Sequence, residues 1–151
     1  MQKRDVVILE AIRLLEMGKR VVLPVSGRSM LPFIIGGKES VELVKANSLK
    51  PYDVVLAWVD NTHYVVHRII KIEDGLFSLM GDGNLCGIEQ CLITDIAAKA
   101  EYIVDNNGKR HYIYTPARKL AASLWKGLLP VRRWLLAVYR RTYLKLKYNE
   151  N

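Results

Sequence analysis

The stretch from residue 63 to residue 80 constrains the fold of this chain more than any other. Two runs rich in aliphatic and aromatic residues, at 63–73 and 76–80, flank the dipeptide Asp74-Gly75. An Asp-Gly pair between two such runs indicates a β-hairpin, because both central positions of its tight turn require positive φ. The sequence therefore predicts antiparallel β-structure at the centre of the chain.

Further strands are predicted on both sides of this hairpin. The stretches with the composition of strands are 20–25, 41–44, 53–59, and a second hairpin formed by 97–104 and 110–114. A short helix is expected at 4–17. We therefore expect a mainly β domain over residues 20–115, with an N-terminal helix within 1–19 and a helical tail over 116–148.

Positive charge is concentrated at the end of the chain. The 151 residues carry 23 Lys+Arg and 15 Asp+Glu, a net charge of +8. Residues 1–116 contain 14 residues of each kind, whereas residues 117–148 contain nine Lys or Arg and no acid. The basic character of the protein therefore belongs to its tail.

The tail has the pattern of amphipathic helices that lie in a membrane interface. Pro130 is expected to divide it into two helices. Trp and Leu side chains gather on one side of the second helix and basic side chains largely on the other. The residues predicted to meet an anionic membrane surface are Arg132, Arg133, Trp134, Arg140 and Arg141. Covering the core of the domain, or a partner helix, is the alternative; nucleic acid is not expected, because Trp and Leu interrupt the basic residues.

No stretch of the chain is expected to span a bilayer. The longest uncharged run in the tail is six residues, against the roughly 20 that a spanning helix needs. The N-terminal residues are interrupted by charge and do not read as a secretory signal. We therefore expect a cytoplasmic protein that associates peripherally with the membrane.

Two residues point to nucleophilic chemistry. Ser29 lies in a Gly-x-Ser-Met-x-Pro turn that runs from Gly27 to Pro32, and His67 lies within a strand-like segment. A serine hydroxyl needs a positioned base to act as a nucleophile at neutral pH. An ordinary turn serine and a buried core histidine are the alternatives, because His67 alternates with apolar residues on one strand face.

Four motifs in order resemble the superfamily of signal peptidases and self-cleaving repressor peptidases. These are the Ser29 turn, Asp53-Val54-Val55, Val66-His67-Arg68-Ile69 and Gly81-Asp82-Gly83-Asn84. The resemblance implies a signal-peptidase/LexA-like β catalytic domain over roughly residues 20 to 105. A histidine in place of the lysine that many members use is similar to the endoplasmic-reticulum and archaeal type of signal peptidase.

The resemblance also implies a role for each site residue. Ser29 would be the nucleophile, His67 the general base, and Asp82 the acid that orients the histidine. Ser26 and Gly27 would support the oxyanion and the turn. Asp82 has a second interpretation, an Asx-type turn with Gly83. The stretch 85–90, where the His-type members often carry another aspartate, has none, so the sequence leaves open which acid completes a triad.

The sequence thus predicts a serine endopeptidase that cleaves a leader- or signal-type peptide. A catalytically inactive β module that binds a peptide or partner at the membrane surface is the alternative. Self-cleavage as a transcriptional switch is not expected, because 19 residues before the core are too few for a DNA-binding domain. Cys86 and Cys91 are too few ligands for structural zinc and are expected to be reduced thiols. Neither a metal nor a cofactor is predicted.

Overall fold

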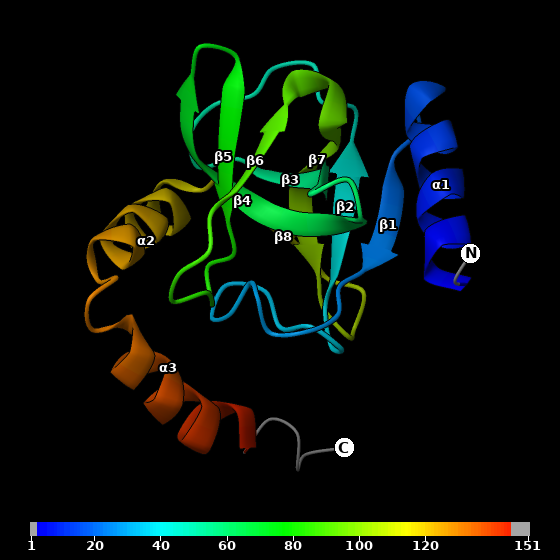
Figure 1. Cartoon of the computed structure of the whole chain (residues 1–151). Helices are drawn as coiled ribbons and strands as arrows, with labels where there is room; N and C mark the ends of the chain where they lie inside the picture. Colours follow the sequence, from blue (N-terminus) through cyan, green and yellow to red (C-terminus); the bar gives the residue numbers. More distant parts are fainter. Residues whose placement is uncertain (1–2, 146–151) are drawn as a thin grey trace.

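The structure is a computed structural model that describes residues 3–145 (Figure 1). Its centre is a curled, antiparallel half-barrel sheet, with one helix before the first strand and two helices after the last. The elements, in order, are α1 (Lys3–Glu16), β1 (Val21–Pro24), β2 (Ser40–Val44), β3 (Val54–Val59), β4 (His63–Glu73), β5 (Leu76–Met80), β6 (Glu89–Leu92), the 3-10 turn η1 (Ile93–Asp95), β7 (Ile96–Val104), β8 (Arg110–Tyr112), α2 (Pro116–Gly127), α3 (Arg132–Tyr139) and the π-helical turn η2 (Arg140–Leu144). The predicted mainly β fold with helical ends is therefore confirmed.

Two of the unpaired strand edges of this sheet lie on β1 and on the first half of β4. The strand order is β1-β2-β7-β3-β4-β5-β6, and β8 pairs with β7. Up to Arg68, β4 pairs with β3, and from Arg68 onward it pairs with β5. The first half of β4 therefore keeps an edge that β5 does not cover. The strand at the start of the order, β1, pairs only with β2, so its other edge is unpaired.

A buried cluster fixes α1 and the loop after β1 to the sheet. Ala11 and Leu15 of α1 and Met30 of the loop pack with apolar side chains of β2, β3 and β7. Tyr114 lies in the same cluster, where its hydroxyl donates to Ala100 O at 2.6 Å and accepts from Val54 N–H at 3.1 Å. Burial raises the pKa of this phenol well above its usual value, so Tyr114 is a neutral crosslink between strands.

The central hairpin has the boundaries that the sequence predicted. Its strands are 63–73 and 76–80, and Asp74 and Gly75 both have positive φ, at 50° and 78°. The second hairpin is also present, with a shorter second strand, β8. The prediction missed β6, because Cys91 is its single buried residue and the strand carries no alternating pattern.

The C-terminal helices pack on the loop that follows β1. As predicted, the helix breaks near Pro130: α2 ends at Gly127 and α3 begins at Arg132. The hydroxyl of Thr115 accepts from Arg118 N–H and caps α2. Leu136 is 2% exposed and packs with Leu31 and Ile35, and Trp125 and Tyr139 flank this cluster. The end of the predicted tail, 146–148, lies outside the described residues.

One predicted surface residue is buried. Arg132 is 3% exposed and donates to Asn84 O at 3.0 Å and to Trp125 O at 2.9 Å. Its prediction as a membrane-surface residue is therefore wrong, since carbonyl groups of the domain hold its guanidinium inside. Arg133, Trp134, Arg140 and Arg141 are exposed, as predicted. Within residues 3–145, no helix is both long enough and apolar enough to cross a membrane.

Candidate active site

The loop that carries Ser29 is a tethered segment between β1 and β2. Gly27 has φ 82°, a conformation that favours glycine. Val25 N–H donates to Glu39 O at 3.2 Å and Gly37 N–H donates to Val25 O at 2.8 Å, which closes the base of the loop. Met30, directly after the serine, is 1% exposed and anchors the loop in the core. Ser29 itself stays partly exposed on an otherwise fixed segment.

Ser29 and His67 line the same cavity. Its volume is about 170 Å³, and the free edges of β1 and β4 form two of its walls. The lining residues are Ile8, Leu23, Pro24, Val25, Ser26, Ser29, Leu56, Tyr64, Val65, Val66 and His67. The structure thus brings together the two residues that the sequence singled out, although 38 positions separate them. Their side chains make no hydrogen bond to each other within the described residues.

Glu89 is the carboxylate that contacts His67. Its Oε2 lies 3.0 Å from His67 Nδ1, and the histidine is 4% exposed. A carboxylate only accepts, so this bond selects the tautomer with the proton on Nδ1. The other ring nitrogen, Nε2, then carries the lone pair, and it has no hydrogen-bond partner within residues 3–145. The arrangement can therefore take up a proton at Nε2.

Asp82, the predicted partner of the histidine, is instead paired with Arg68. Arg68 Nε donates to Asp82 Oδ1 at 2.8 Å and a terminal nitrogen donates to Oδ2 at 2.7 Å. The third nitrogen of Arg68 donates to Tyr52 O at 2.9 Å. Burial disfavours the charged guanidinium, but the bonds from Asp82 outweigh it and raise the pKa of Arg68. Within the described residues Asp82 makes no hydrogen bond to His67.

The Gly81-Asp82-Gly83 turn holds the backbone of the Ser29 loop. Gly83 N–H donates to Ser29 O at 2.7 Å. A side chain at Gly81 would overlap Ser29 O, and one at Gly83 would overlap Arg28 O. Glycine is required at both positions because two backbone segments approach closely there. The motif that suggested a catalytic acid therefore positions the candidate nucleophile.

The C-terminal helices are fastened to the outer side of the same turn. Trp125 Nε1 of α2 donates to Asp82 O at 2.7 Å, and Arg132 at the start of α3 donates to Asn84 O. Phe33 of the loop contacts both sides, with its ring 5.4 Å from the Arg68 guanidinium and edge-on to the Trp125 ring at 6.3 Å. The Gly81–Asn84 turn thus contacts β4, the Ser29 loop and the C-terminal helices.

Two polar groups in the Ser29 loop are candidates for oxyanion support, the N–H of Ser29 and the hydroxyl of Ser26. Ser29 N–H makes no hydrogen bond within residues 3–145. Ser26 lines the cavity and is exposed. An oxyanion hole needs donors that no group of the protein already occupies, and the Ser29 N–H meets this condition. The role of Ser26 and Gly27 as oxyanion and turn support stays a prediction.

Sequence reasoning did not assign Glu89, because its place is visible only in the sheet register. Glu89 pairs with Leu79, and Leu79 pairs with Ile69. Side chains of directly paired residues share a face, and so do residues two apart on one strand. Glu89 and His67 therefore share a face of the sheet across β5. Without β6 in the predicted fold, nothing in the sequence distinguishes Glu89 from a solvated surface acid.

Comparison with known proteins gave no match: no family model, no curated protein and no solved structure is significantly similar to this chain.

Proposed function

We propose that this protein is a serine endopeptidase in which Ser29 is the nucleophile, His67 the general base and Glu89 the acid. The observation that carries the proposal is the shared cavity of Ser29 and His67, with Glu89 bound to the far nitrogen of the imidazole. The order of the four motifs, which resembles signal-peptidase/LexA-like domains, supports the same reading.

The chemistry follows from this arrangement. Ser29 Oγ attacks the carbonyl carbon of the scissile peptide bond while His67 Nε2 takes the hydroxyl proton. Glu89 stabilises the imidazolium through Nδ1, and Ser29 N–H donates to the oxyanion. The proton passes to the leaving amine as the C–N bond breaks and an acyl-enzyme remains. Water, deprotonated by His67, then hydrolyses the ester and restores Ser29. In this scheme the hydrogen bond between Ser29 and His67 forms only when substrate binds and excludes water. Catalytic hydrogen bonds are often long or poorly aligned in the free enzyme.

The free strand edges define how a substrate would bind. An extended peptide that enters between β1 and the first half of β4 finds unpaired backbone groups on both sides. The cavity at Ser29 is small and lined mainly by apolar side chains. We therefore expect small side chains next to the scissile bond, in keeping with a leader- or signal-type peptide.

A census of protein N-termini in the native host tests this proposal. Wild type is compared with Ser29→Ala and with Ser48→Ala, an exposed serine outside the cavity. Termini that are present with wild type and the Ser48 variant but lost with Ser29→Ala support the peptidase. Their sequences would also define the cleavage motif. Identical termini in all three strains, with each protein folded and expressed, would count against it.

The alternative function is a catalytically inactive module that binds a peptide. The absence of a Ser29–His67 hydrogen bond in this structure is the observation that favours it. A binding module keeps its affinity for peptide when Ser29 is replaced by Ala and never releases a shortened product. An enzyme with the same substitution binds peptide and loses turnover.

We also propose that α2 and α3 attach the protein to an anionic membrane surface. Each helix carries a stripe of exposed apolar side chains, while its inner side packs on the domain. The exposed apolar residues are Leu120, Leu124 and Leu128 in or just after α2, and Val131, Trp134, Leu135 and Val138 in or just before α3. Exposed Arg133, Arg140 and Arg141 supply the charge, each worth about 1 kcal/mol near an anionic leaflet.

Sedimentation with vesicles tests this surface. The variant Trp134→Ser/Val138→Ser removes two exposed apolar side chains from α3, and Leu92→Ser removes an exposed one from β6 as the control. We expect the α3 variant to bind anionic vesicles at least about tenfold more weakly, because each large side chain contributes roughly 1.5–3 kcal/mol when buried. Equal binding of all three proteins would contradict the membrane surface.

A further inference from the structure

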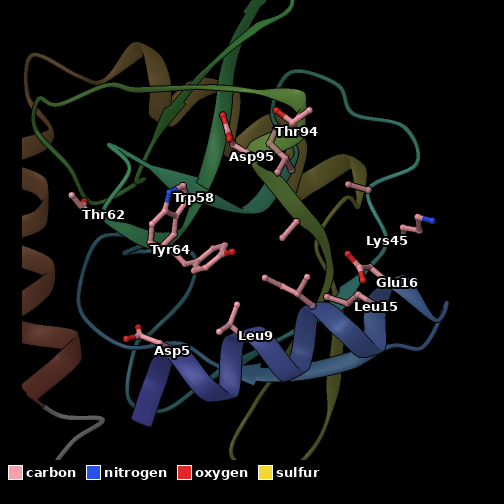
Figure 2. A pocket seen from close by; sticks show the side chains of 14 residues that line it. Asp5, Leu9, Leu15, Glu16, Lys45, Trp58, Thr62, Tyr64, Thr94 and Asp95 are labelled. Atoms are coloured by element: carbon pink, nitrogen blue, oxygen red, sulfur yellow. The ribbon is translucent and has the colours of Figure 1, made fainter. Parts of the chain in front are cut away.

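A second, larger cavity adjoins the one at Ser29. Its volume is about 690 Å³, and it lies between α1, the β3–β4 turn and the start of β7 (Figure 2). Tyr64 lines both cavities, and the neighbouring α1 residues Ile8 and Leu9 line one each. The two cavities therefore lie side by side at Tyr64 and α1.

The interior of this cavity is aromatic and aliphatic. Trp58 and Tyr64 pack against each other with ring centroids 4.8 Å apart. Figure 2 shows Leu9 and Leu15 on the α1 side and the two rings on the sheet side. The volume falls within the usual range for ligand pockets, roughly 300–1,000 Å³. A space of this size and lining accepts a large apolar or aromatic side chain.

The rim of the cavity is acidic. Three carboxylates line it, those of Asp5, Glu16 and Asp95, against the single ammonium of Lys45. An excess of negative charge around an apolar interior favours a ligand that combines an apolar group with a cation. Residues 1–116 are neutral as a whole, so the excess of negative charge at this rim is local.

The length of β1 indicates how far along a bound peptide the side chain in this cavity would lie from the scissile bond. Ser29 follows the end of β1, whereas Lys45 and Ala46 of the cavity follow the end of β2, opposite the start of β1. β1 has four residues, and an extended chain advances about 3.3 Å per residue. A peptide bound along β1 with its scissile bond at Ser29 reaches this cavity four to six residues away.

We infer that this cavity is a second substrate subsite that takes a large apolar or aromatic side chain beside a Lys or Arg. The inference rests on the proposed function, because it needs a peptide in the groove between β1 and β4. It makes cleavage depend on two places in the substrate, small residues at the cut and an apolar, basic pair at a fixed separation. Such spacing restricts the enzyme to few sequences.

Selection from a displayed library of random 15-residue peptides tests the subsite. The bait is Ser29→Ala, alone and combined with Thr94→Trp, which places an indole into the cavity from an exposed rim position. Asn107→Trp, in the exposed β7–β8 turn, is the matched control. We expect the first bait and the control to enrich an aromatic or aliphatic residue next to Lys or Arg. With Thr94→Trp the same peptides should bind about tenfold more weakly or worse.

Two further comparisons make the outcome decisive. Glu16→Gln should weaken the preference for the basic neighbour, while Glu73→Gln on the distant hairpin should not. A motif that survives Thr94→Trp, or no enrichment at all, overturns the subsite. Cleavage of the enriched peptides by wild-type protein is measured separately. Peptides that bind through the cavity but are never cut would uphold the subsite and refute the peptidase.

Discussion

Glu89→Gln and Asp82→Asn both change a carboxylate to its amide in the same region, but we predict that they affect different properties of the protein. Glu89 contacts His67 through one bond, and a fifth of its side chain is exposed. Asp82 binds Arg68 through both oxygens, and both residues are buried. The first substitution should therefore impair proton transfer, and the second should impair folding.

The burial of the ion pair sets the size of the effect at Asp82. An amide cannot neutralise the Arg68 guanidinium, which stays buried and loses one of its two bonds to residue 82. Removing one partner of a buried pair costs about 3–5 kcal/mol, out of a total stability of roughly 5–15 kcal/mol for a domain of this kind. For a chain of this length Tm should fall by about 10 °C.

The partial exposure of Glu89 sets the size of the effect there. A single hydrogen bond at a partly exposed site contributes about 1 kcal/mol to folding, so stability should change little. Loss of the carboxylate removes the tautomer selection at Nδ1 and the stabilisation of the imidazolium. In serine proteases the equivalent change lowers kcat by about 10⁴-fold. We expect a loss of about 10²- to 10⁴-fold here, because solvent reaches Glu89.

Two measurements on the same preparations distinguish these effects. Urea unfolding followed by tryptophan fluorescence gives the free energy of unfolding, and cleavage of a peptide at 20 °C gives kcat per folded molecule. An Asp82→Asn protein with wild-type stability and greatly reduced kcat would refute the reasoning, and so would a Glu89→Gln protein with full activity. The first result would return Asp82 to the position of catalytic acid, and the second would remove Glu89 from that role.

Three other predictions follow from the packing and the ionisation of the described residues. Burial, aided by Asp95, raises the pKa of the Cys91 thiol to about 11, so iodoacetamide at pH 8 should modify exposed Cys86 and leave Cys91 intact until urea unfolds the protein. Gly83→Ala should cost about 1–3 kcal/mol, because the added methyl overlaps the backbone of the Ser29 loop; unchanged urea unfolding would contradict this. The hydrogen bond from His111 lowers the pKa of Asp105, so this pair stabilises the fold above the ordinary carboxyl pKa and ceases to do so as pH falls through the lowered pKa. In a carboxyl NMR titration, His111→Ala should move the midpoint of Asp105 upward.

The elements that the sequence predicted well are those that local chemistry determines. Asp74-Gly75 set the central turn, and Pro130 set the break between α2 and α3, because each restricts the backbone without help from distant residues. Ser29 and His67 were singled out by the motifs that carry them, and both residues line one cavity; their catalytic roles stay a prediction.

The parts that sequence reasoning missed depend on contacts between distant residues. Arg132 looks like any other charge in a basic helix until Asn84 and Trp125 present their carbonyl oxygens to it. Asp82 sits in the motif where a catalytic acid was expected, and only the buried guanidinium of Arg68 reveals its different role. Ion pairing of this kind leaves no periodic trace in a sequence.

His67 and Arg68 are neighbours on β4, opposite Val55 and Val54 of β3. Successive residues on a strand point to opposite faces. His67 therefore lines the cavity, while Arg68 binds Asp82 in the turn that contacts the C-terminal helices. A shift of β4 by one residue would therefore place the Arg68 guanidinium in the cavity and the His67 imidazole beside Asp82. Substitutions can accumulate around this dipeptide, but an insertion or deletion in the first half of β4 cannot be absorbed there. In related chains, a change of length between Asp53 and His67 should therefore be confined to the β3–β4 turn, where it leaves the pairing of His67 with Val55 intact.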